Sequence, residues 1–134
     1  MKIFSIAVLA SLAFLVTPAA KADSVATLKA LYQSQGAKDF NREVGEALWH
    51  KILQHRQSGQ QRSCVDCHGK NLKLPGKHIR TGKVIEPLAP SVNPKRFSDQ
   101  RKVEKWFTRN CKWTLGRECS SQEKGDLLVY LSSQ

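Results

Sequence analysis

Methionine, acidic residues and long apolar runs are scarce in this sequence. Met1 is the single methionine, and 11 acidic residues stand against 22 lysines and arginines. The longest apolar run, from Ile3 to Val16, is too short to span a bilayer, so the sequence predicts no membrane insertion. A second Cys-x-x-Cys pair and a His-x-x-x-His pair are also missing, which argues against the usual structural zinc sites.

The N-terminal segment has the features of a secretory signal peptide. Lys2 precedes the apolar run, and the small-residue pattern Ala20-Lys21-Ala22 follows it. We therefore expect cleavage after Ala22, which would leave residues 23–134 as one domain of 112 residues without methionine. Export without a membrane-spanning segment predicts a periplasmic protein.

The motif with the clearest chemistry is Cys64-Val65-Asp66-Cys67-His68. Two thiols separated by two residues and followed at once by histidine are typical of covalent haem c attachment. Cys64 and Cys67 would form thioether bonds to the haem, and His68 would be the proximal iron ligand. Half of a zinc site and a redox dithiol are the alternatives, although the sequence lacks the β-α-β pattern expected around a redox dithiol.

Export agrees with haem attachment, because c-type haem is attached outside the cytoplasm in bacteria. An oxidising compartment also leaves Cys111 and Cys119 free to pair. Removal of Lys2 and Lys21 lowers the net charge from +11 to +9. This excess predicts docking onto acidic redox partner proteins, such as another cytochrome, and the compartment argues against nucleic acid.

Helical periodicity predicts four helices and no convincing strands. The first ends at Gly36, with its apolar pattern at Val25, Leu28, Leu31 and Tyr32. The second is capped by Asp39, with an apolar stripe at Phe40, Val44, Ala47, Leu48 and Ile52. A loop at residues 75–94 holds all four prolines of the mature chain and is expected to wrap over the haem edge.

Two more helices are predicted in the C-terminal part. One should open at Ser98, with an inward face at Val103, Trp106, Phe107 and Asn110. The last should begin at Ser120, where Glu123 completes a capping box, and should bury Leu127, Leu128 and Leu131. The fold class is therefore all-α, with helices before and after the motif packed around one haem.

Gly45-x-x-x-Trp49 and Leu127-x-x-Tyr130 resemble the helix-crossing pairs of class I cytochromes c. The resemblance implies a small class I-like helical fold around one covalently attached haem. Members of that family normally supply a methionine as sixth iron ligand. This chain departs from that pattern, because Met1 is its single methionine and would be removed with the signal peptide.

Within class I, the chain is similar to the sphaeroides haem proteins, oxygen-binding cytochromes c with an asparagine ligand. The similarity lies in residues 86–91 (EPLAPS), 106–111 (WFTRNC) and 115–119 (LGREC). It implies that Asn110 is a labile distal ligand that leaves the iron on reduction, which would let ferrous haem bind O2, NO or CO. It also implies a disulfide between Cys111 and Cys119, next to Asn110, with Trp113 inside the closed loop.

The sequence leaves two alternatives open. His78 could be the sixth ligand, because imidazole binds iron better than an amide oxygen, and the protein would then be a plain bis-His electron carrier. His50 and His55 are expected at polar surface positions. An enzyme that acts on nitric oxide is the other hypothesis, but no acid–base constellation indicates catalysis.

Overall fold

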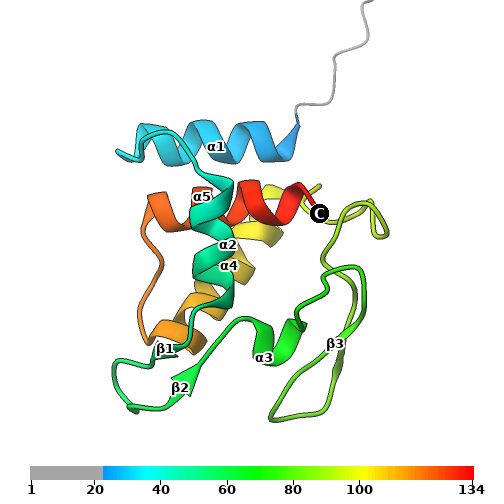
Figure 1. Ribbon diagram of the computed structural model, residues 1–134. Coiled ribbons are helices and arrows are strands. Elements are labelled where there is room, and N and C mark those ends of the chain that lie inside the picture. The colour runs from blue at the N-terminus through cyan, green and yellow to red at the C-terminus, as the bar shows by residue number, and fades with distance from the viewer. Residues whose placement is uncertain (1–22) are drawn as a thin grey trace, which may run out of the picture.

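The computed structural model describes residues 23–134 (Figure 1), and the predicted signal peptide lies outside this range. It contains five helices: α1 (Ser24–Ser34), α2 (Arg42–His50), α3 (Val65–His68), α4 (Gln100–Leu115) and α5 (Ser121–Ser132). Two antiparallel pairs of two-residue strands were not predicted: β1 (Leu53–Gln54) with β2 (Gln61–Arg62), and β3 (Gly76–Lys77) with β4 (Val84–Ile85). They are short, so the predicted all-α class is confirmed.

The core forms where three helices meet. Helix α5 packs against α2 and also against α1, which lies above it at the top of Figure 1. Leu28 and Tyr32 of α1 and Leu128 of α5 are the largest fully buried side chains. The predicted apolar face of the last helix is correct, because Leu127 and Leu131 are buried as well.

Two of the three predicted helix caps are wrong by one or two residues. Asn41, not Asp39, caps α2, because its side chain accepts the backbone N–H of Val44 at 2.9 Å. Asp99, not Ser98, caps α4 by accepting the backbone N–H of Lys102. The capping box of Ser120 and Glu123 is present as predicted.

The predicted stripe of the second helix is also wrong in part. Val44, Ala47 and Ile52 are exposed, and the buried residues of α2 are Gly45 and Trp49. The reason is that α2 presents its smallest residue to α5 and ends at His50, so Ile52 lies outside the helix. Leu31 of α1 is also exposed, because Leu28 and Tyr32 form the buried side of that helix.

Helix α4 buries a slightly different face from the predicted one. Its buried residues are Val103, Phe107, Cys111 and Thr114. Trp106 remains 45% exposed, because it lies at the border of this face. Within residues 23–134, no helix combines the length and the apolar character needed to cross a membrane.

Candidate haem site

The Cys-x-x-Cys-His motif forms one helical turn, α3, that follows directly on β2. The backbone N–H of Ser63 donates to the Asp66 carboxylate at 2.7 Å, which holds the turn closed. The buried Ser63 hydroxyl donates to the carbonyl of Trp49 at 3.3 Å and so ties the motif to the end of α2. Residues three and four apart share one side of a helix, so this turn presents Cys64, Cys67 and His68 together.

His68 lies in close packing that fixes its backbone and ring. The ring centroids of His68 and Trp49 are 5.3 Å apart, and Trp49 is buried. On the other side, a Cβ added to Gly76 would stand 2.2 Å from the Cys67 carbonyl oxygen and 2.9 Å from the His68 Cα. Only glycine therefore allows β3 to lie this close to the haem motif.

Burial keeps the His68 imidazole neutral. Burial, and secondarily the positive charge of Arg96, lower the pKa of His68 to about 4. Arg96 is itself fixed by donating to the carbonyls of Pro87 at 2.7 Å and Glu86 at 2.6 Å. A neutral imidazole is the form that binds a metal, so His68 is ready for ligation at neutral pH.

The two thiols of the motif are not bonded to each other. Burial raises the pKa of Cys64 to about 11, and the nearby Thr114 hydroxyl acts in the opposite direction. Cys64 therefore stays a protonated thiol at neutral pH. Two unpaired thiols and a neutral imidazole on one helical turn are the donor set that haem c requires, so the residues present fit this group.

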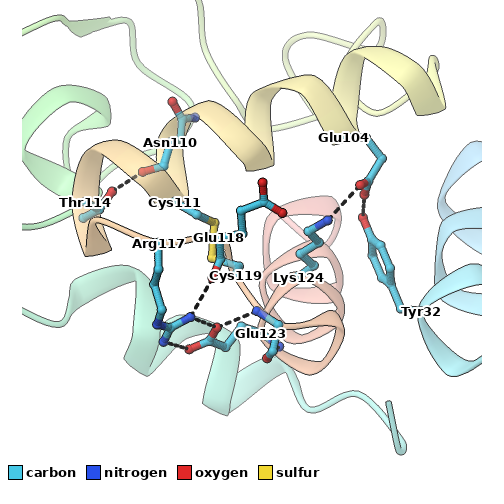
Figure 2. The surroundings of a disulfide bond; sticks show 11 residues. Tyr32, Glu104, Asn110, Cys111, Thr114, Arg117, Glu118, Cys119, Glu123 and Lys124 are labelled. Atoms are coloured by element: carbon cyan, nitrogen blue, oxygen red, sulfur yellow. Dashed lines mark hydrogen bonds and ion pairs between the residues drawn. A yellow bond between two sulfur atoms is a disulfide. The ribbon is translucent and has the colours of Figure 1, made fainter. Parts of the chain in front are cut away.

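Helix α4 brings Asn110 to the same region. The hydroxyl of Thr114, which lies beside the Cys64 thiol, donates to the backbone carbonyl of Asn110 at 2.6 Å. Asn110 is not one of the residues that α4 buries against the protein; its side chain is exposed at the edge of that face. Among the described residues, no hydrogen bond restrains its side-chain amide, and Figure 2 shows it pointing away from Cys111.

Cys111 and Cys119 are joined in the structure, with Cα atoms 5.5 Å apart and both side chains buried (Figure 2). The bond links the end of α4 to the start of α5. Beside it, Arg117 and Glu123 form a two-bond ion pair with both N···O distances at 2.7 Å. The segment that follows Asn110 is therefore held at several points.

The histidine alternatives have other partners. Nδ1 of His78 accepts the backbone N–H groups of Arg80 at 3.3 Å and Thr81 at 3.2 Å, so its own turn holds the ring. The ring also packs against Trp113, with centroids 5.7 Å apart. His50 is exposed, and His55 lies 3.1 Å from the backbone carbonyl of Lys112.

Some residues of the site could not be predicted from the sequence. Gly76 and Thr114 carry no recognisable motif, and their roles arise from contacts between distant segments. Trp49 was noticed only for the helix crossing, although it also packs on His68. Its indole N–H is buried and lacks a hydrogen-bond partner among the described residues.

Similarity to known proteins identifies the family of this chain. Residues 35–131 match the family described as "Domain of unknown function (DUF1924)". The Cytochrome c-type protein SHP of Cereibacter sphaeroides is 42% identical over 125 residues, which cover 91% of this chain and 94% of SHP. The chain belongs to the SHP family of c-type cytochromes. Cytochrome c'' of Methylophilus methylotrophus is 48% identical over 77 residues, 58% of this chain and 54% of that protein.

Solved structures agree with the SHP assignment. Oxidized SHP, described as an oxygen binding cytochrome c, superposes with a TM-score of 0.73 at 40% identity, covering 82% of this chain and 96% of SHP. Oxidized cytochrome c'' gives 0.68 at 35% identity, covering 81% of this chain and 92% of cytochrome c''. The class I-like fold and one covalently bound haem c are thereby confirmed. Because haem c attachment uses both thiols of the motif, it rules out the zinc and redox-dithiol alternatives.

Proposed function

We propose that this monohaem cytochrome transfers single electrons in the periplasm and, when reduced, binds a diatomic ligand at the iron position that Asn110 leaves. Haem c supplies a one-electron centre whose sixth position can take O2, NO or CO. Cys64 and Cys67 hold the group covalently, His68 is the proximal ligand, and Asn110 is the labile distal ligand. Residues 1–22 are the signal peptide that directs residues 23–134 to the periplasm.

The observation that carries this proposal is the position of Asn110 on α4. It lies one helical turn before Thr114, whose hydroxyl is beside the thiol of Cys64. Residues four apart share one side of a helix, so Asn110 and Thr114 lie on the side of α4 that is next to the Cys64 thiol. This supports Asn110 as the residue that would supply the second protein ligand of the iron.

The chemistry of an amide explains why reduction would open the site. The Asn110 oxygen is a neutral, hard and weak donor, which tolerates Fe(III) and is held poorly by the softer Fe(II). Because no hydrogen bond among the described residues restrains the Asn110 amide, moving it away from the iron breaks no protein contact of that group. The disulfide of Cys111 keeps the adjacent backbone in place during this movement.

The relatives support the same function. The structure of oxidized SHP is described as that of an oxygen binding cytochrome c. A solution structure of cytochrome c'', 34% identical with a TM-score of 0.71, is described as giving insights into haem-ligand detachment. A weakly held sixth ligand in this chain accords with both descriptions.

Carbon monoxide provides the test, applied to the reduced mature holoprotein. An open or weakly occupied ferrous site should change its visible spectrum within the mixing time and saturate at one CO per haem. A bis-His carrier with His68 and His78 as ligands should keep its spectrum, because both positions are filled by strong donors. An unchanged spectrum would overturn the proposal and favour that alternative.

A further inference from the structure

Positive charge is concentrated around the haem motif. Residues 51–83 contain eight lysines and arginines but one acid, Asp66, so this third of the mature chain carries +7 of its +9 charge. Four ion pairs occur among residues 23–134, and all lie outside this segment. In Figure 1 the segment forms the end of the molecule that holds α3 and β1–β3, away from α1.

Two parts of this basic segment converge on one tryptophan. The guanidinium carbon of Arg62 lies 4.0 Å from the Trp113 ring centroid, and that of Arg80 lies 5.1 Å away. They line an open hollow of about 570 Å³ together with Gln60, Gln61, Ile79 and Trp113. Arg62 also donates to the Trp113 carbonyl and to Gln60, whereas the Arg80 guanidinium has no hydrogen bond or ion pair within residues 23–134.

The hollow adjoins the side of the motif where the haem is attached. Arg62 is two residues before Cys64, and Trp113 precedes Thr114, whose hydroxyl lies beside the Cys64 thiol. In the porphyrin of haem c, the thioether bonds occupy two neighbouring pyrroles and the propionates occupy the other two. The haem's own carboxylates would therefore lie toward the opposite edge, which leaves the Arg80 guanidinium available to a carboxylate of another protein.

We propose that this hollow is the docking site for an acidic one-electron carrier protein, with a carboxylate side chain of the partner between Arg62 and Arg80. Guanidinium groups bind carboxylates through two parallel hydrogen bonds, and tryptophan and arginine dominate the binding energy of many interfaces. Docking there places the partner at the thioether edge of the haem, where an electron has a short path. The inference rests on the proposed electron-transfer function and locates it on the surface.

The test uses the mature holoprotein on a gold electrode covered with a carboxylate-terminated monolayer, an extended acidic surface that stands in for the partner. Voltammetry gives the electron-transfer rate and the midpoint potential together. Arg80→Gln should slow electron transfer by up to about fivefold at low ionic strength, the effect of one exposed ion pair, and high salt should remove the difference. Arg80→Lys should keep most of the rate, because it keeps the charge.

Arg101→Gln is the matched control. It removes the same charge near the start of α4, about 18 Å along the helix axis from Trp113, and should leave the rate nearly unchanged. Equal slowing by Arg80→Gln and Arg101→Gln would show that net charge alone acts and would overturn the docking site. A shifted midpoint potential with an unchanged rate would overturn it too, because Arg80 would then act on the haem's own carboxylates.

Voltammetry also distinguishes failure of the docking site from failure of the proposed electron-transfer function. A normal redox wave with identical rates in all variants overturns the docking site alone. A holoprotein that gives no wave on the carboxylate monolayer and none on a hydroxyl-terminated one does not exchange electrons readily, which overturns the electron-transfer function and the docking site together.

Discussion

Gly45 of α2 lies directly against the backbone of Asp126 in α5. A Cβ at Gly45 would stand 2.0 Å from the carbonyl oxygen of Asp126 and 2.5 Å from its carbonyl carbon. Backbone atoms cannot rotate away, so any side chain at Gly45 pushes the two helices apart. This crossing positions Trp49, which packs both on His68 and on Tyr130 of α5.

Gly45→Ala should therefore destabilise the protein. Alanine favours a helix over glycine by about 1 kcal/mol, but overpacking against a backbone costs more, and we expect a net loss of about 2 kcal/mol. Urea unfolding of the holoprotein measures it. Val44→Ala, on the exposed side of the same helix, is the control and should change the free energy of unfolding by less than about 0.5 kcal/mol. Equal stability of Gly45→Ala and wild type would show that the crossing is looser than the structure indicates.

The pairing of Cys111 with Cys119 can be checked chemically. Alkylation of the unfolded, unreduced holoprotein followed by mass spectrometry should label neither residue. Replacing both by serine opens a loop of about nine residues and should cost roughly 2–3 kcal/mol of stability. Labelling of both cysteines without prior reduction would contradict the disulfide.

Glu123 should make stability depend on pH in the acidic range. The bonds from Arg117, and secondarily those from Ser120, lower the pKa of its carboxyl group in the folded state. A lowered pKa means that the stabilisation is present above the unfolded-state pKa, about 4.3, and is lost as pH falls through the folded-state value.

Glu123→Gln should consequently cost about 1 kcal/mol at pH 7, since Arg117 stays partly exposed, and almost nothing at pH 2. Thermal unfolding at both pH values measures the difference. Glu118→Gln removes a charge from a more exposed pair with Lys112 and is the control, with little effect at either pH. A cost for Glu123→Gln that does not change with pH would assign the effect to packing.

The sequence allowed the haem motif, the all-α class and the family to be predicted, because each depends on local spacing. Ser120 and Glu123 could be recognised as a capping box for the same reason. The predicted cap of α2 was wrong because Asp39 and Asn41 can both cap a helix. A contact with α5 selects Asn41, whose backbone N–H donates to the Asp126 carboxylate at 2.8 Å. Such long-range contacts leave no local signal.

The candidate site also has a part that local spacing predicts and a part that depends on contacts between distant segments. Cys64, Cys67 and His68 lie within five residues, so their spacing alone indicates their chemistry. The contact of Gly76 with the His68 backbone joins segments that no periodicity relates. The convergence of Arg62 and Arg80 on Trp113 likewise requires three separate segments to be folded.

The last prediction separates Asn110 from His78 as the sixth ligand. Asn110→Val removes the amide oxygen at similar bulk, so the ferric spectrum should change while the ferrous spectrum stays nearly constant, because on the proposed function Asn110 would already have left the reduced iron. Asn110→His, where its geometry allows ligation, should fill the position and slow CO binding. His78→Ala should leave both spectra intact, since the turn at Arg80 and Thr81 already holds that ring. If His78→Ala turns a low-spin ferrous haem high-spin and Asn110→Val has no effect, His78 is the ligand and the protein is a bis-His electron carrier.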